Sequence, residues 1–383
     1  MHEINNTKTD ARRLALLCLT AWHEKGTFIW DSLEWYKNSR TIEPRDIDFA
    51  YELACGTVRF FGYLRYVAKT LGALPKKPKE RLLLFLALYQ RLFLDTPAYA
   101  VVHTSVQLAK TSCSIHFSWY LNAVLQKELP KPTPEAVIRH SFPEFYINCL
   151  TKQYGKEKTD ELLLLQNSPS PRMVTLFDPI RNVILESDSP SGYIQNYTPY
   201  LLVTSLAGAC TSPPKRILDM CAAPGGKTVL LSKLFPEAHI VANDLAKKSD
   251  LLRQNINRFC PHVELRTGPG QEISTKAPFD LIVIDAPCSN SGVLYKCPEA
   301  RFRLNPDTLV ELETLQKSLF EHALTLVGDT GSLWYMTCSI LQQENELFCQ
   351  KMAHQFGLQI ISKHLILPNH MGHDGGFGCL FRF

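Results

Sequence analysis

The sequence predicts an α/β protein in which an all-α domain precedes a doubly wound sheet. Over the first 132 residues, apolar residues recur at helical spacing with few glycines. After about residue 192, short apolar runs alternate with helical segments, as in a parallel sheet covered on both faces. The 383 residues suffice for two or three domains, and a composition of 45% apolar and 20% charged residues excludes a disordered or fibrous chain.

The first part of the chain is predicted to be a bundle of helices. Segment 81–94 is apolar on nearly every face, which indicates the central helix of the bundle. Residues 1–132 hold 18 of the 41 Lys and Arg but only 12 of the 37 Asp and Glu, so the excess positive charge lies here and suggests nucleic-acid binding. The predicted helices cover residues 10–24, 45–70, 78–95, 98–111 and 115–128.

Three prolines, at positions 130, 132 and 134, mark the end of this first domain. We expect domains over 1–132 and 193–383, joined by a linker over 133–192 that begins with a few helical turns and becomes polar from residue 167. The last domain is expected to close with an antiparallel pair, 359–364 and 378–383, at one edge of its sheet. Its preceding strands are predicted over 216–220, 239–243, 263–266, 281–285 and 332–336, with helices such as 228–235 and 307–326 between them.

Several classes of protein are excluded. The longest apolar stretch, 82–94, is interrupted by two polar residues and is shorter than the ~20 residues of a membrane span. The basic pair before segment 14–22 is not followed by a small-x-small cleavage site, so no secretory signal is expected. The twelve cysteines are scattered without any C-x-x-C pair, which favours free thiols in a reducing cytoplasm over disulfides or a metal site.

The loop after the first strand of the sheet, Asp219 to Thr228, joins that strand to a helix. Its G-G-K-T ending is similar to a phosphate-binding loop, but Cys221 stands where that motif needs its first glycine, so nucleoside triphosphate binding is rejected. A small-residue turn at a helix N-terminus still offers backbone donors to a carboxylate. Asp244, at the end of the second strand, is placed to accept the hydroxyls of a ribose. A ribose and a carboxylate without pyrophosphate indicate S-adenosylmethionine.

Two cysteines follow neighbouring strands, Cys288 after the fourth and Cys338 after the fifth. Ligands bind beyond the carboxyl ends of such strands, so both thiols are expected over one pocket. A thiolate that adds to C6 of cytosine makes C5 nucleophilic enough to take a methyl group, and a second base must then remove the C5 proton. Asp285 is expected to stabilise the adduct at N3 or N4, and the charge of Lys227 to lower a thiol pKa.

Together these motifs resemble the RNA cytosine-C5 methyltransferases of the Sun/RsmB (NSUN) type. The resemblance rests on L-D-M-C-A-A-P-G-G-K-T at 218–228, D-A-P-C-S at 285–289, T-C-S at 337–339 and D-G-G-F at 374–377. It implies a Rossmann-like class I methyltransferase fold, in which Cys338 is the nucleophile and Cys288 assists release of the methylated base. The cofactor contacts that it implies are Cys221, Ala222, Ala223, Pro224, Gly225, Gly226, Lys227, Asp244 and Asp285, and the RNA contacts are Lys227, Lys296, Arg301 and Arg303.

The helical domain also resembles a known module, the NusB-like RNA-binding domain. E-L-A-C-G-T-V-R at 52–59 and L-N-A-V-L at 121–125 carry this resemblance. The fusion of such a domain to this catalytic core is typical of the family branch that methylates 16S ribosomal RNA. It implies that the substrate is 16S rRNA or a small-subunit assembly intermediate, with no membrane partner, and we expect a monomer.

Three positions depart from the family pattern. Pro269 stands where an acid usually follows the third strand, and Gln195-Asn196 replaces a common Q-D pair. The segment between Met173 and Tyr193 is short, so the RNA-binding subdomain in the linker is expected to be reduced. A ribosomal RNA-binding or assembly protein without catalysis is the alternative that Pro269 leaves open. An amino-group methyltransferase is disfavoured because it needs no thiol.

Overall fold

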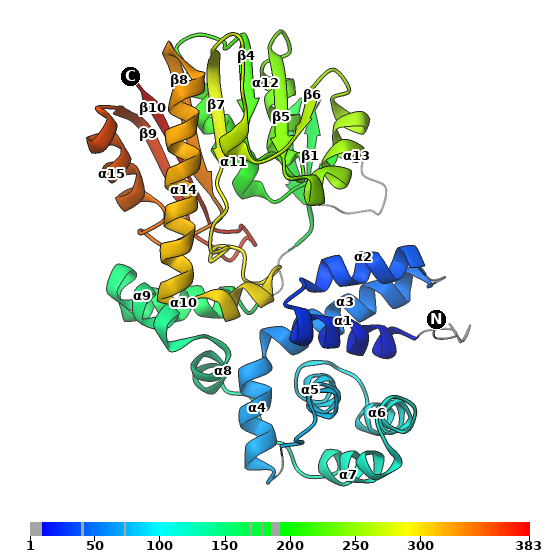
Figure 1. The fold of residues 1–383 in the computed structure, drawn as a ribbon. Helices are drawn as coiled ribbons and strands as arrows, with labels where there is room; N and C mark the ends of the chain where they lie inside the picture. Colours follow the sequence, from blue (N-terminus) through cyan, green and yellow to red (C-terminus); the bar gives the residue numbers. More distant parts are fainter. Residues whose placement is uncertain (1–9, 40–41, 73, 169–170, 178, 185–191) are drawn as a thin grey trace. The chain divides into compact units, whose positions relative to one another are not determined.

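The computed structural model describes residues 10–39, 42–72, 74–168, 171–177, 179–184 and 192–383. The chain divides into two compact units (Figure 1). The first unit, which we call the helical unit, comprises Met1–Ile147 together with Lys296–Phe302, and the second, the sheet unit, comprises Asn148–Tyr295 and Arg303–Phe383.

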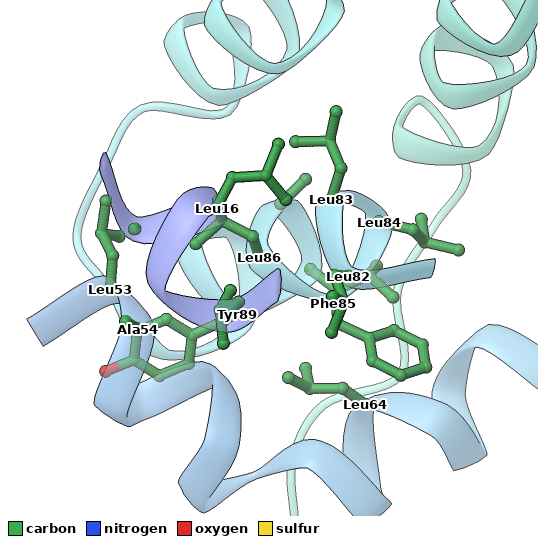
Figure 2. Close-up of a cluster of buried hydrophobic side chains, with 14 of the residues drawn as sticks. Leu16, Leu53, Ala54, Leu64, Leu82, Leu83, Leu84, Phe85, Leu86 and Tyr89 are labelled. Carbon is green, nitrogen blue, oxygen red and sulfur yellow. The ribbon is translucent and has the colours of Figure 1, made fainter. Parts of the chain in front are cut away.

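The helical unit is built around α5, as the apolar segment predicts. Every residue from Leu82 to Gln90 is buried in this helix, and Figure 2 shows its side chains packed against those of Leu16, Leu53 and Leu64. The helices are α1 (Ala11–Lys25), α2 (Ile29–Ser39), α3 (Pro44–Arg59), α4 (Phe61–Thr70), α5 (Pro78–Phe93), α6 (Ala98–Ser112), α7 (Ile115–Leu125) and α8 (Pro134–Ser141).

Two features of this unit differ from the sequence prediction. The single helix expected over 45–70 is two helices, because Phe60 leaves helical geometry (φ −104°, ψ 15°) and stacks its buried ring on Phe93 at 4.0 Å between centroids. Helix α2 was not predicted, although the sequence places Ile29 and Leu33, both buried, four residues apart on one of its faces.

Residues 296–302 belong to the helical unit although they lie far from it in sequence. The backbone N–H of Ile29 donates to Glu299 at 2.5 Å, and the guanidinium of Arg301 donates to the Arg59 carbonyl at 2.8 Å. The ring of Phe302 packs edge-on against Trp22 at 5.1 Å between centroids. The segment therefore contributes side chains to the interior of the bundle.

The sheet unit includes a small antiparallel sheet that the sequence did not predict. Helices α9 (Glu144–Tyr154) and α10 (Lys156–Leu165) lead to strands β1 (Met173–Phe177), β2 (Ile180–Ile184) and β3 (Tyr193–Ile194), in the order β2-β1-β3. Strand β1 pairs with both neighbours, with Val174 opposite Val183 and Thr175 opposite Tyr193. This sheet occupies the short segment ahead of the main sheet.

The main sheet has seven strands in the order β6-β5-β4-β7-β8-β10-β9. Pairing is parallel from β6 to β8 and antiparallel along β8-β10-β9, which confirms the predicted strands and the antiparallel pair at one edge. The strands are β4 (Arg216–Asp219), β5 (His239–Asp244), β6 (Glu264–Thr267), β7 (Phe279–Asp285), β8 (Val327–Thr337), β9 (Gln359–Ile366) and β10 (Gly376–Arg382).

Helices cover both faces of this sheet (Figure 1), so the predicted doubly wound fold is confirmed. Strand β7 shows why its sequence is apolar throughout: Leu281 and Val283 belong to one core, and Ile282 and Ile284 to the other. The first core includes residues of α11 (Tyr197–Gly208), α12 (Gly226–Leu234) and α13 (Ser249–Phe259), and the second includes residues of α14 (Pro306–Leu326) and α15 (Glu346–Phe356). Short 3-10 turns lie at Ala246–Lys248, Gly270–Glu272 and Pro298–Arg303.

No helix within the described ranges is long and apolar enough to span a membrane.

Candidate active site

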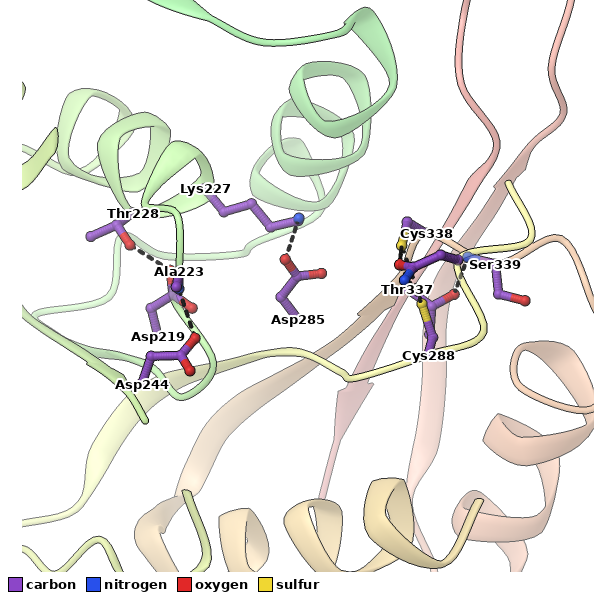
Figure 3. Close-up of polar contacts among 11 residues, drawn as sticks. Asp219, Ala223, Lys227, Thr228, Asp244, Asp285, Cys288, Thr337, Cys338 and Ser339 are labelled. Carbon is purple, nitrogen blue, oxygen red and sulfur yellow. Dashed lines mark hydrogen bonds and ion pairs between the residues drawn. The ribbon is translucent and has the colours of Figure 1, made fainter. Parts of the chain in front are cut away.

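The carboxyl ends of the parallel strands bring the predicted site residues to one edge of the sheet. Strands β4, β7 and β8 are consecutive neighbours, with Asp219 beside Val283 and Asp285 beside Met336. The loops that carry Cys288 and Cys338 start directly beyond these positions. Figure 3 shows the resulting group of polar side chains.

The loop between β4 and α12 is a tight turn closed by its own backbone. The N–H of Gly225 donates to the Ala222 carbonyl at 2.7 Å, and the N–H of Ala222 donates to the Asn243 carbonyl at 2.8 Å. Gly225 has a φ of 110°, which L side chains rarely adopt, and it precedes the first residue of α12. A Cβ on Gly226 would lie 2.7 Å from Gln195 Nε2 and 2.8 Å from the ring of buried Tyr193, so a larger residue here would force these side chains to move.

Asp244 at the end of β5 holds this loop in place. One oxygen of its carboxylate accepts from the Ala223 N–H at 2.9 Å (Figure 3), and the other accepts from the Leu245 N–H at 2.7 Å. The side chain is 6% exposed. Each carboxylate oxygen can accept a second hydrogen bond, so Asp244 retains acceptor capacity for the ribose hydroxyls that the sequence predicts.

Asp219 is a buried carboxylate with an unused acceptor. Its Oδ2 accepts from the Thr228 hydroxyl at 2.7 Å, whereas its Oδ1 is buried without a hydrogen-bond partner among the described residues. Burial raises the pKa of Asp219 to about 7, although the Thr228 hydrogen bond acts in the opposite direction. An orphaned acceptor beside a small-residue turn fits a ligand with donor groups, such as the amino or ribose groups of S-adenosylmethionine.

Lys227 and Asp285 form an ion pair at 2.5 Å across the same edge (Figure 3). Burial lowers the pKa of Lys227, but the charge and hydrogen bond of Asp285 outweigh it, so the pKa of the ammonium ends above its ordinary value. The nearby Cys221 thiol is affected differently, since burial and the surrounding carboxylates raise its pKa and keep it neutral. Cys221 can therefore line the loop only as a small, uncharged group.

The structure brings the two predicted thiols together. The sulfur atoms of Cys288 and Cys338 lie 3.2 Å apart, and both side chains point toward one another in Figure 3. The Cys338 thiol also lies 2.8 Å from Oδ1 of Asn290, which is 4.0 Å from the Cys288 sulfur. All twelve cysteines of the chain are free thiols.

The surroundings of Cys338 hold its thiol in the protonated form. Its pKa is raised well above the ordinary value by the hydrogen bond with Cys288 first, then by burial and by the charge of Asp285. Lys227 acts in the expected direction and lowers this pKa, but its effect is outweighed. The thiolate thus needs further stabilisation before it can attack.

A buried carboxylate, Glu344, ties the two cysteine loops to each other. It is 1% exposed and accepts from the Ser289 N–H at 2.8 Å, the Ser289 hydroxyl at 2.5 Å and the Ser339 hydroxyl at 2.6 Å. A fourth bond comes from Gln316 Nε2 at 3.2 Å. Ser289 follows Cys288 and Ser339 follows Cys338, so one carboxylate fixes the spacing of both thiols.

Of the departures from the family pattern, the asparagine at 196 has a local explanation. The side chain of Asn196 accepts from the N–H groups of Thr198 and Asp374 and donates to the Gly372 carbonyl at 2.9 Å, a donor contact that an ionised aspartate lacks. Pro269 precedes the short turn after β6, and it offers no side-chain acceptor beside the site.

The predicted RNA contacts have different surroundings. Arg303 is exposed and Lys296 is half-buried, so their predicted role stays a prediction. Arg301 is 0% exposed, and its guanidinium lies 4.1 Å from the centre of the Phe142 ring. In this structure Arg301 packs inside the helical unit and does not present its charge to a nucleic acid.

Sequence reasoning did not assign roles to Asp219, Asn290 or Glu344. Asp219 lies inside the loop motif and at the carboxyl end of a predicted strand, and that position could have marked it as a site residue. The roles of Asn290 and Glu344 depend on how two loops fold onto each other, which no local pattern records.

Comparisons with known proteins agree with this architecture. Residues 211–364 match the family model described as 16S rRNA methyltransferase RsmB/F, and residues 9–129 match the NusB family. Relatives include the ribosomal RNA small subunit methyltransferase B of Proteus mirabilis, which is 26% identical over 89% of this chain and 91% of its own length. The protein of the same name from Vibrio cholerae is 28% identical over 80% of this chain and 81% of its own length.

Solved structures show the same fold. The crystal structure of PH0851 superposes with a TM-score of 0.76 and 20% identity, over 97% of this chain and 98% of that one. A methyltransferase homolog protein from Pyrococcus horikoshii superposes with a TM-score of 0.54 and 19% identity, over 64% of this chain and 97% of that one. Two family models thus match in chain order, and the chain carries a NusB-family domain ahead of a methyltransferase domain of the RsmB/F type.

Proposed function

We propose that this protein methylates C5 of a cytosine in 16S ribosomal RNA, with S-adenosylmethionine as the methyl donor and Cys338 as a covalent nucleophile. The pair of thiols 3.2 Å apart at the ends of β7 and β8 carries the proposal. Methyl transfer to an amino group requires no thiol, whereas C5 of cytosine must first be activated by a nucleophile at C6. The names of the relatives support ribosomal RNA of the small subunit as the substrate.

The residues at the sheet edge fit the cofactor. The loop from Cys221 to Lys227 and the carboxylates of Asp219, Asp244 and Asp285 would hold it through its amino acid and ribose groups. When bound, S-adenosylmethionine supplies an electrophilic methyl group. The loop's backbone amides and the Asp219 carboxylate would contribute the polar partners for binding.

The chain's own residues would perform the nucleophilic and proton-transfer steps. The Cys338 thiolate forms a bond to C6 of cytosine, and the electron pair of the C5=C6 bond moves into the ring toward N3 and C5. Asp285, which is paired with Lys227, would stabilise the adduct at N4 by accepting a hydrogen bond from the amino group, or at N3 by donating a proton after it has taken one up.

Cys288 would complete the reaction as the base. After methylation, its thiolate removes the proton from C5, the electron pair re-forms the C5=C6 bond, and the bond from C6 to Cys338 breaks. Its sulfur is close enough to that of Cys338 for both to reach one pyrimidine ring.

The remaining assignments belong to the same proposal. The helical domain over 1–132 and the reduced RNA-binding subdomain over 133–192, which holds β1 and β2, would contact the RNA around the target, and the domain over 193–383 would perform catalysis. Lys227, Lys296 and Arg303 are the basic contacts that keep this role. The protein would act as a monomer in the cytoplasm, on naked 16S rRNA or on a partly assembled subunit.

Two variants test the covalent step. With 16S rRNA and S-adenosylmethionine, Cys338→Ala should abolish turnover, whereas Cys288→Ala should accumulate a protein–RNA adduct that survives denaturing electrophoresis. Cys113→Ala removes a half-buried thiol of the helical unit and serves as the matched control, which should behave as wild type.

Mass spectrometry of rRNA from a deletion strain should show one 5-methylcytidine missing. An unchanged modification profile, or a Cys288→Ala variant that traps no adduct, would refute the proposal. If calorimetry also detected no binding of S-adenosylmethionine, an assembly protein without catalysis would be favoured.

A further inference from the structure

Asn290 has an unusual backbone in the loop that carries Cys288. Its φ is 58°, and it is the one non-glycine residue with a positive φ in the part of the chain that the structure describes. Asparagine tolerates this left-handed conformation better than most residues, but glycine adopts it more readily. A strained residue beside two reactive thiols calls for a reason in its side chain.

The side chain of Asn290 contacts the nucleophile directly. Its Oδ1 lies 2.8 Å from the Cys338 sulfur and 4.0 Å from the Cys288 sulfur. Its NH2 group has no hydrogen-bond acceptor among the described residues, so a half-turn about the Cβ–Cγ bond breaks no other protein contact of the amide. That half-turn exchanges an acceptor for a donor at the same place, since the two ends of a carboxamide have nearly the same shape.

We propose that Asn290 is a catalytic hydrogen-bond partner of Cys338. Its Oδ1 accepts from the resting thiol, and after a half-turn about the Cβ–Cγ bond its Nδ2 donates to the thiolate. The inference deepens the proposed function, on which it rests for the role of Cys338. A hydrogen bond to an ionised sulfur is stronger than one from a neutral thiol, so the net effect of the amide favours the thiolate.

The other charged and titratable groups around Cys338 explain why such a donor is needed. Cys288 and Asp285 both raise the pKa of the Cys338 thiol, and Lys227 alone among these neighbours lowers it. Lys227 is already paired with Asp285 at 2.5 Å, which weakens its effect on the sulfur. A neutral donor that touches the sulfur adds stabilisation without disturbing this pair.

The test measures alkylation of Cys338 in the full chain, without RNA or cofactor. Iodoacetamide reacts with the thiolate, whose sulfur displaces iodide after its proton has passed to water. Peptide mass spectrometry gives the rate at Cys338 across a pH series for wild type, Asn290→Gly and Asn290→Asp. The half-buried thiol of Cys113 in the same samples is the internal control.

Asn290→Gly suits the backbone and removes the amide, so the alkylation rate at neutral pH should fall about tenfold, the effect of a thiol pKa raised by one unit. Asn290→Asp has the same shape but cannot donate when ionised, and its charge should slow the reaction further. Cys379 is buried in the sheet unit, so its alkylation would show that the glycine variant does not fold properly. In that case the alkylation rate of Cys338 in the aspartate variant is compared with that of wild type.

A glycine variant that reacts as fast as wild type at every pH would overturn the inference, as would a wild-type Cys338 that resists alkylation throughout. Neither result depends on methyl transfer. The proposed function can therefore fail while the pH profile still shifts, and the profile can stay unchanged while the Cys288→Ala variant still traps RNA.

Discussion

Replacing Glu344 should loosen the two cysteine loops and destabilise the sheet unit. Its carboxylate accepts four hydrogen bonds, from the Ser289 N–H, the hydroxyls of Ser289 and Ser339, and the side chain of Gln316. In Glu344→Ala the hydroxyls can turn to other acceptors, and Gln316 keeps its bond to the Pro287 carbonyl. The Ser289 N–H is left buried without an acceptor.

The size of the effect follows from these contacts. An unsatisfied buried N–H costs roughly 1–3 kcal/mol, and each lost hydroxyl bond costs about 1 kcal/mol, so Glu344→Ala should lower the free energy of unfolding by about 3–5 kcal/mol. Glu344→Gln keeps one oxygen for the Ser289 N–H, and the serine hydroxyls can accept from its new amide, so a loss of about 1 kcal/mol is expected.

The urea concentration at which buried thiols become open to alkylation measures the stability of each unit separately. Cys349 and Cys379 are buried in the sheet unit, and Cys18 and Cys55 are buried in the helical unit. Pulse alkylation with mass spectrometry should show Cys349 and Cys379 exposed at lower urea in Glu344→Ala, while the midpoint for Cys18 stays unchanged.

The matched control is Glu313→Ala, which removes an exposed ion pair with Lys351 and should shift the midpoint little. If Glu344→Ala unfolded at the same urea concentration as Glu313→Ala, the carboxylate would not be holding the loops together, and the reasoning would be wrong.

Three further predictions concern charged residues. Burial raises the pKa of Asp219 to about 7, above the ~4 of an unfolded aspartate, so its ionisation destabilises the fold increasingly from about pH 4 to about pH 7 and by a constant amount at higher pH. Asp219→Asn should therefore raise the free energy of unfolding, measured by urea titration, by up to about 4 kcal/mol above pH 7 and little near pH 4. Lys227→Met leaves Asp285 unpaired and removes the one cation that lowers the Cys338 pKa, so alkylation of Cys338 at neutral pH should slow about tenfold; an unchanged rate would contradict this. Arg301→Ala should lower the free energy of unfolding of the helical unit by on the order of 3 kcal/mol. Arg303→Ala should leave that free energy unchanged and reduce the salt dependence of RNA binding by about one phosphate contact. Equal effects of the two variants on stability would contradict the burial of Arg301.

The strands of the main sheet were predictable because they are buried on both faces. A run such as Leu281 to Ile284 can satisfy two cores only as a central strand, and this requirement is visible in the sequence. Strands β2 and β3 were missed for the opposite reason, since β2 is largely exposed and β3 has two residues. Neither carries the apolar periodicity on which the prediction depended.

In the candidate site, a contact was predictable where both partners directly follow strands of the parallel sheet. The two thiols were predicted to meet because each directly follows a strand of the same parallel sheet, and the structure places them in contact. Arg301 was assigned to RNA because it lies in a basic segment, but its partner Arg59 is 242 residues away and gives no local signal. Glu344 likewise acts through Ser289, 55 residues earlier.

The membership of residues 296–302 in the helical unit has a consequence for synthesis on the ribosome. The first 147 residues emerge well before this segment, and the intervening stretch belongs to the other unit. At roughly 5–20 residues per second, about 7–30 s pass before Glu299 and Arg301 reach the N–H of Ile29 and the carbonyl of Arg59. During that interval the nascent bundle lacks the contacts that Glu299 and Arg301 make. A fragment that stops at residue 147 would lack them permanently.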